Sequence, residues 1–304
     1  MKKRFGRDLL VYSGMVAPGL IIYLFIVTFP IIYSIWISVT DFNPNRGGAW
    51  NFVGFDQYIT MFKDPLFWHS FKNGMIVVAV SVLGQIPIGF VLAYILFRKS
   101  VRAQHFFQSM IFLPQFLSTI VIGTLAKRIM QADGPLARLI QLISGNPSAQ
   151  FEMMLRVDTV MIPVGIVLIW MYTGLYMMIF LANLQKIDES MIEAAQIDGA
   201  SEPQIFLRII VPLLSGTIIV CTTLAIAGSL RGFDLIFALT TRGLSRQNAM
   251  VLPIFMYQTA FDDYRNPMRF AYGSAISNAI VVISVTFILL SSWIGKKLHA
   301  GEEN

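Results

Sequence analysis

The chain has 304 residues, of which 56% are hydrophobic and 13% carry a charge, and its net charge is +6. Soluble proteins average about 25% charged residues. The composition therefore excludes a soluble enzyme and a disordered regulator, and the single cysteine, Cys221, excludes a disulfide-stapled secreted domain. The positive net charge by itself does not indicate a nucleic-acid partner, because a membrane protein with basic cytoplasmic loops has the same total.

Six stretches of the chain contain no Asp, Glu, Lys or Arg, and they are between 22 and 32 residues long. Each is longer than the run of about 18 apolar residues that marks a candidate transmembrane helix. We therefore expect an all-α integral membrane protein whose residues 1–304 form one transmembrane domain. The first span is too long for the core of a signal peptide, so we expect it to be retained. The six transmembrane helices are expected at approximately 11–38, 73–97, 106–126, 159–185, 209–230 and 270–295.

The loops between these spans differ in their content of basic residues. If both termini face the cytoplasm, the cytoplasmic segments hold eleven Lys or Arg in 48 residues, and the opposite loops hold twelve in 103 residues. Basic residues are enriched in the cytoplasmic loops of membrane proteins. The twofold higher density predicts cytoplasmic N- and C-termini in a multi-pass protein.

The longest of the cytoplasmic segments, residues 186–208, is a polar insert between the fourth and fifth spans. Ser190 and Glu193 have the spacing of a capping box, in which each side chain satisfies a free backbone N–H of the first helical turn. This pattern predicts a helix from Met191 to Asp198. Gly199 follows, and it suits the left-handed residue that ends a helix.

A second helix is expected after the glycine. Ser201 and Gln204 repeat the capping pattern, and the helix continues into the fifth span with an expected kink at Pro212. The small pair Ala194–Ala195 lets another surface approach closely, and apolar residues rimmed by charge are typical of a docking site. A solvated connector between two spans fits the same pattern, and the residues alone leave both interpretations open.

The insert carries a recognisable motif. Glu193-Ala194-Ala195, with Gly199 six residues after the glutamate and Pro212 further along, reproduces the spacing of the EAA motif. On these residues the chain resembles the inner-membrane permease subunits of binding-protein-dependent ABC importers. The string EAAQIDGA together with Phe206 resembles the sugar-permease branch of maltose and glycerol-phosphate type, and its first permease subunit in particular. The family's T-G-G-P after span five is replaced here by residues 240–244.

The resemblance implies a type I ABC importer permease fold with six transmembrane helices, in which residues 186–208 are a cytoplasmic coupling-helix loop. The chain is then no enzyme and holds no cofactor or metal, because ATP and Mg²⁺ are bound by partner subunits. The implied partners in a bacterial inner membrane are a second homologous permease subunit, an ABC ATPase dimer, an extracytoplasmic solute-binding protein and a sugar-like solute. The residues implied to couple to the ATPase are Glu193, Ala194, Ala195, Asp198, Gly199 and Pro212.

Polar and aromatic side chains inside the spans are candidates for a solute pathway, because such groups are unexpected in lipid. Packing is the simpler explanation of any single one, since Gln, Ser and Thr also join membrane helices. The candidates are Gln85, Gln115, Trp170, Tyr172, Thr173, Tyr176, Asn183, Ser229 and Asn278.

The resemblance to maltose-type permeases selects positions after the Leu-Pro of span three, around the Trp of span four and at the end of span five. Arg231 there either binds an anionic group of the solute or extends toward the lipid headgroups. The solute contacts implied in this way are Gln115, Trp170, Tyr172, Ser229, Arg231 and Gly232.

Other functions fit the residues less well. A permease for a polyol, a glycerol-phosphate-type compound or another small polar solute remains an alternative to a sugar permease. A secondary transporter should contain inverted repeats and ionisable groups at membrane depth, and neither is evident. A membrane-embedded enzyme needs a cluster of catalytic side chains, but no Asp, Glu or His lies deep within any charge-free stretch.

Overall fold

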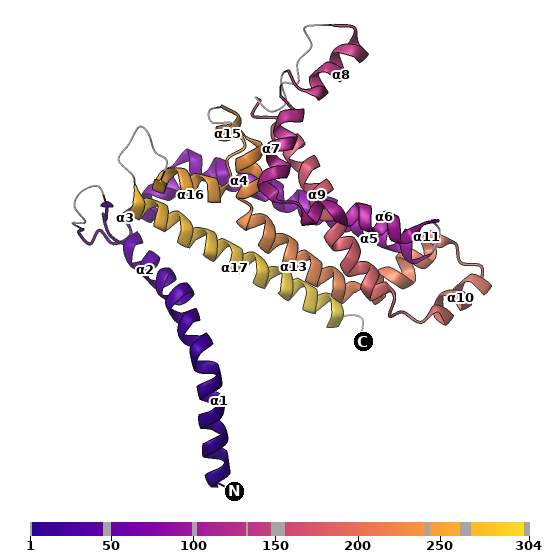
Figure 1. Ribbon diagram of the computed structural model, residues 1–304, viewed down its shortest axis with the longest axis horizontal. Coiled ribbons are helices and arrows are strands. Elements are labelled where there is room, and N and C mark those ends of the chain that lie inside the picture. The colour runs from indigo at the N-terminus through magenta and orange to yellow at the C-terminus, as the bar shows by residue number, and fades with distance from the viewer. Residues whose placement is uncertain are drawn as a thin grey trace. The chain divides into compact units, whose positions relative to one another are not determined.

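The chain is almost entirely helical in the computed structural model (Figure 1). The described residues are 2–44, 50–98, 102–131, 133–146, 156–240, 244–261 and 269–300. They form two compact units, Met1–Pro65 with Met256–Val281 and Leu66–Phe255 with Val282–Asn304. Most of the replacement for T-G-G-P, residues 241–243, lies outside the described residues. The single domain over 1–304 stays a prediction.

Among the described residues, four helices are long and apolar enough to cross a membrane. They are Tyr12–Ser38, Pro65–Phe97, Met161–Leu184 and Phe270–Gly295. Two further candidates are helix pairs with a sharp bend, Gln104–Phe116 with Thr119–Ile129 at 96° and Glu202–Leu213 with Ser215–Arg231 at 73°. If each bent pair is one span, the count is the six expected from the sequence.

The two bent pairs each have a proline close to the break, at Pro114 in the third span and at Pro212 in the fifth. Proline has no N–H to donate to the carbonyl four residues earlier, and its ring collides with that carbonyl. Pro114 lies in a 3₁₀-helical turn, Leu113–Phe116, after which the backbone is extended at Leu117. Pro212 lies in the short α12 (Val211–Leu213), directly before the second break at Leu214. The kink expected near Pro212 is therefore present.

The first unit is held together by polar contacts to α17. Its helices are α1 (Lys2–Tyr23), α2 (Phe29–Ser38), α3 (Asp56–Lys63), most of α16 (Leu252–Phe261) and the start of α17 (Phe270–Ala300). The Asn278 amide donates to Tyr58 Oη at 3.3 Å and its oxygen accepts from Ser34 Oγ at 3.3 Å. Asn278, a pathway candidate in the sequence, therefore joins helices here.

The second unit is organised around a close pair of helices, α5 and α9. Its helices include α4 (Pro65–Val80), α5 (Ile86–Phe97), α6 (Gln104–Phe112), α7 (Thr119–Ile129), α8 (Pro135–Ser144), α9 (Met161–Leu184), α13 (Ser215–Arg231), α14 (Asp234–Leu239) and α15 (Leu244–Asn248). A Cβ on Gly89 of α5 would lie 2.9 Å from Tyr176 Cβ and from Met177 N of α9. The missing side chain lets the two backbones touch, and the stacked rings of Phe90 and Phe180, 4.4 Å apart, fill the space beside them.

The polar insert folds as two helices joined by a glycine elbow, α10 (Glu189–Ile197) and α11 (Glu202–Ile205). The predicted Ser190–Glu193 capping box was wrong, because the Asp188 carboxylate caps α10 by accepting from the Ser190 N–H at 3.0 Å. This stronger acceptor starts the helix two residues earlier than predicted. The second box is confirmed, with Gln204 Oε1 accepting from the Ser201 N–H at 2.8 Å.

Candidate functional site

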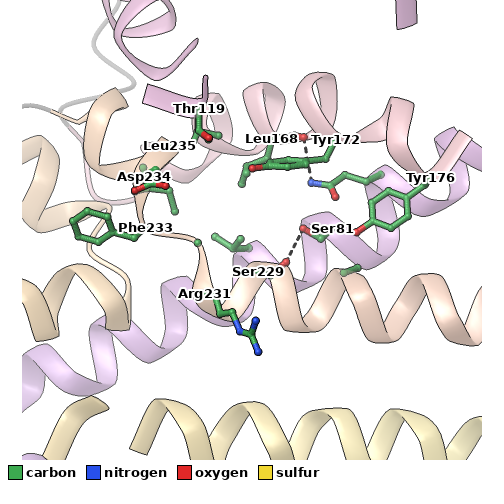
Figure 2. Close-up of a pocket in the computed structure, with 16 residues that line it drawn as sticks. Ser81, Thr119, Leu168, Tyr172, Tyr176, Ser229, Arg231, Phe233, Asp234 and Leu235 are labelled. Carbon is green, nitrogen blue, oxygen red and sulfur yellow. Dashed lines mark hydrogen bonds between the residues drawn. The ribbon is translucent and has the colours of Figure 1, made fainter. Parts of the chain in front are cut away.

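A pocket of about 220 Å³ lies within the second unit, walled by α9, α13, the start of α14 and the π-helical turn Ser81–Gln85 (Figure 2). Leu168, Tyr172 and Tyr176 face it from α9. They recur at intervals of four residues, so they share one side of that helix. The remaining lining residues are Val77, Ser81, Gln85, Thr119, Ala225, Gly228, Ser229, Arg231, Gly232, Phe233, Asp234, Leu235 and Ile236.

Two buried polar side chains form one wall of this pocket. Ser81 and Gln85 begin and end the π-helical turn between α4 and α5, and both are almost completely buried. The Gln85 amide donates to the Leu168 carbonyl at 3.2 Å, and Ser229 Oγ of α13 donates to Ser81 Oγ at 2.8 Å. π-helical turns are frequent at functional sites. Here the turn places hydroxyl and amide groups beside two tyrosine rings.

The structure brings four of the six predicted solute contacts to this pocket. Tyr172, Ser229, Arg231 and Gly232 line it. Gly232 ends α13, with an extended backbone at φ −60° and ψ 96°. In Figure 2 the guanidinium of Arg231 points away from the tyrosine rings. Arg231 thus lines the pocket without directing its charged group at the two rings.

The other two predicted contacts, Gln115 and Trp170, are not among the lining residues. Trp170 lies two positions before Tyr172, which turns it about 200° away around the same helix. Its side chain is 54% exposed. Gln115 lies in the 3₁₀ turn after Pro114, and its side-chain oxygen is buried without a hydrogen-bond partner.

Several lining residues were absent from the predicted contacts. Gln85 and Tyr176 are among the polar groups within the spans, but the resemblance to maltose-type permeases does not point to them. Ser81 could have been found from its position four residues before Gln85, since the two share a helix face. Asp234 lies outside the charge-free stretches, and nothing in its spacing points to a pocket. No group of three His, Cys, Asp or Glu able to hold a metal occurs in the described part of the chain.

The elbow of the polar insert ends α10 in a defined way. Gly199 has φ +82°, its N–H donates to the Gln196 carbonyl at 3.0 Å, and the Ala200 N–H donates to the Ala195 carbonyl at 2.9 Å. These two bonds form a Schellman motif, as expected for a glycine after a helix. At the other end of α10, hydrogen bonds from Ser190 lower the pKa of Asp188. Both ends of this short helix are therefore fixed.

One face of α10 is buried and the other is open. Ile192 is 2% exposed and packs into the core, whereas Glu193 and Ala194 are exposed. Ala195 is partly buried, and Asp198 is exposed beside the elbow. Ile197 is 86% exposed, a high value for an isoleucine. The outward face thus combines an acidic group, a small residue and an apolar one.

Membrane-spanning helices, a polar pocket between them and an exposed helix–elbow–helix segment define the class as a multi-pass membrane transport protein. A family model described as "Binding-protein-dependent transport system inner membrane component" matches residues 85–301, more than half of the chain. The chain belongs to this family. It is a permease subunit of an ABC importer, a transport component and not an enzyme, and ATP is handled by a partner ATPase.

Several characterised or inferred permeases resemble the chain over most of its length. A probable ABC transporter permease protein of Pyrococcus horikoshii is 31% identical over 274 residues, 90% of this chain and 91% of the relative. YurN of Bacillus subtilis, also a probable ABC transporter permease protein, is 30% identical and covers 90% of this chain and 91% of the relative. The lactose transport system permease protein LacF of Rhizobium radiobacter is 27% identical, covering 93% of both chains.

The fold is also that of a solved importer subunit. A chain of a bacterial ABC transporter involved in the import of the acidic polysaccharide alginate superposes with a TM-score of 0.82. The match covers 97% of this chain and 98% of that chain, at 21% identity. A chain of a bacterial alginate ABC transporter in complex with an alginate pentasaccharide-bound periplasmic protein gives a TM-score of 0.81. At this level of identity the likeness establishes the fold.

Proposed function

We propose that the chain forms half of the translocation pathway of a carbohydrate importer, and that a sugar or oligosaccharide passes through the pocket between α9 and α13. In this proposal the second half is a homologous permease subunit. An extracytoplasmic binding protein delivers the solute, and an ATPase dimer on the cytoplasmic side drives the transport cycle. Both termini and the insert 186–208 face the cytoplasm.

The observation that carries the proposal is the chemistry of the pocket wall. Sugars offer apolar C–H faces that stack on aromatic rings and hydroxyls that exchange hydrogen bonds with amides and hydroxyls. The pocket places Tyr172 and Tyr176 beside Gln85, Ser81 and Ser229. Pockets for small molecules combine apolar and aromatic side chains with a few placed polar groups, and this lining contains both kinds. The lactose permease among the relatives supports a carbohydrate as the solute class.

The insert supplies the proposed ATPase contact. The open face of α10 presents Glu193 and Ala194, and Ile197 projects next to the elbow. A short exposed helix with capped ends is suited to enter a groove as a rigid body, because little conformational entropy is lost on docking. Gly199 sets the angle of the elbow, and Pro212 precedes the bend that leads into α13. Movement of α10 is then transmitted to the helix that carries Ser229.

A solute with a phosphate or carboxylate is a weaker alternative. Arg231 is the cationic group of the pocket lining, but it points away from the tyrosine rings, and Asp234 adds a carboxylate to the same lining (Figure 2). An anion close to a carboxylate is disfavoured by charge repulsion. The pocket therefore favours a neutral solute.

Replacing Tyr172 with alanine should raise the KM for uptake about tenfold with little change in ATPase copurification. Loss of one aromatic contact and of the area that it buries accounts for about 1.4 kcal/mol, which corresponds to a factor of ten. The KM is measured from uptake by vesicles that contain the reconstituted transporter. Tyr23→Ala, which removes an exposed tyrosine from the first span, is the matched control. An unchanged KM for each of the solutes that the transporter carries would contradict the proposed site.

A further inference from the structure

The elbow of the insert is tied to the end of the second span by one carboxylate. Glu202 is the first residue of α11, and its side chain accepts hydrogen bonds at both oxygens. Oε2 accepts from Tyr94 Oη at 2.7 Å and from Arg98 Nε at 3.2 Å, and Oε1 accepts from Arg98 Nη2 at 2.5 Å. Gln196 of α10 also donates to Oε1, at 3.4 Å. We call Glu202, Tyr94, Arg98 and Gln196 the elbow latch.

The latch joins segments that are distant along the chain. Tyr94 and Arg98 are four residues apart at the C-terminal end of α5, so both side chains lie on one face of that helix. Glu202 is 104 residues after Arg98. The two Arg98 nitrogens bind the two Glu202 oxygens in the fork arrangement that fixes orientation as well as distance. The elbow is therefore held to α5 at a defined angle.

Aromatic packing extends the latch toward the pocket. The Phe206 ring lies 4.9 Å from the Tyr94 ring and 4.9 Å from the Phe90 ring, and Phe90 stacks on Phe180 of α9. α5 has 12 residues and runs from the latch to the turn that carries Gln85. A helix of this length spans about 18 Å and transmits displacement as a rod. The latch and the pocket wall are thus opposite ends of one rigid element.

The latch contributes little to folding stability. The Glu202 side chain is 52% exposed and that of Arg98 is 22% exposed. An ion pair that water reaches contributes little to stability, because water screens it and ordering long side chains costs entropy. The four hydrogen bonds of the latch fix the direction in which the Glu202 carboxylate lies, and with it the orientation of the elbow.

We propose that Glu202 is a positioning residue that makes the insert and α5 move together, so that displacement of α10 reaches the pocket wall through α5 as well as through α13. The inference rests on the proposed ATPase contact at α10. The Glu202–Arg98 pair transmits the displacement of α10 to α5. Without the pair, α10 still docks and the ATPase still hydrolyses ATP, but α5 follows the motion less completely.

The test uses the complete transporter in vesicles, with uptake and ATP hydrolysis measured on the same preparation. Glu202→Gln and Glu202→Arg should lower the uptake per ATP hydrolysed about fivefold or more, as expected for loss of a typical coupling interaction. The ATPase should copurify at the level of the unmodified protein. The double variant Glu202→Arg with Arg98→Glu should recover most of the ratio, because the fork re-forms with its charges exchanged.

Asp56→Asn is the matched control, because Asp56 is also an acid in the first turn of a short helix and takes no part in the latch. An unchanged ratio in both Glu202 variants overturns the inference. So does a parallel loss of uptake, hydrolysis and folded protein that the charge exchange fails to rescue, since that is the result of a purely structural role. Failure of the unmodified protein to copurify with an ATPase would instead overturn the proposed function.

Discussion

Gly199→Leu and Glu193→Lys are expected to abolish most ATP-driven uptake, by different routes. At φ +82° a leucine is strained, which costs about 1–3 kcal/mol and opens the Schellman bonds that end α10. Glu193 is exposed, so a lysine there leaves the helix intact and reverses one charge on the face proposed to dock. Both variants should lose ATPase copurification or stimulation while affinity for the binding protein is retained.

Two control variants distinguish a loss of ATPase docking from an effect of backbone strain or charge reversal elsewhere in the chain. Gly145 also follows a helix, α8, with φ +65° and open space around it, so Gly145→Leu introduces the same backbone strain outside the insert. Asp158→Lys makes the same charge reversal at another exposed acid. Both should leave ATPase copurification unchanged. Normal stimulation and uptake in Gly199→Leu and Glu193→Lys would contradict the proposed role of the insert.

The spans were predictable because charge is so costly in a bilayer that its absence marks them. Their ends were less predictable, since a helix continues past the membrane wherever its backbone remains bonded. The helix predicted from residue 73 begins at Pro65 and contains Lys72, a residue that a charge-free stretch cannot include. The break after Pro114 was missed although Pro212 was expected to kink its helix. Each proline has the same local effect, but the sequence does not specify how far the chain turns afterwards.

The pocket was predicted in part, and helix geometry accounts for the difference. Tyr172 and Trp170 were selected together, but residues two apart on a helix face nearly opposite sides, so one of them had to point away. The spacing of four between Tyr172 and Tyr176 contained the better signal. Ser81 and Gln85 have the same spacing of four, although no sequence pattern indicated the π-helical turn that they begin and end. The elbow latch was also beyond sequence reasoning, because Arg98 and Glu202 meet only when α5 and α11 pack.

The largest stability effect is expected from Gly174→Ala on α9. A Cβ there would lie 2.4 Å from the Ile111 carbonyl oxygen and 2.9 Å from Phe112 Cα. Both are backbone atoms, so no side chain can move aside, and the helices must separate. Overpacking of this kind costs about 1–3 kcal/mol and sometimes more. Thermal unfolding of the purified protein should therefore show a clear loss of stability.

Gly74→Ala is the matched control, because Gly74 is a buried helical glycine with no atom within 4 Å of an added Cβ. Alanine there should be neutral or stabilising by about 1 kcal/mol, since it restricts the unfolded chain. Equal stability of the two variants would contradict the close contact.

Ile111 and Phe112 directly precede the break after Pro114, so this contact also fixes where the third span bends relative to α9. Gly174→Ala should consequently alter the KM for uptake, because Tyr172 and Thr119 lie on either side of that junction and both line the pocket.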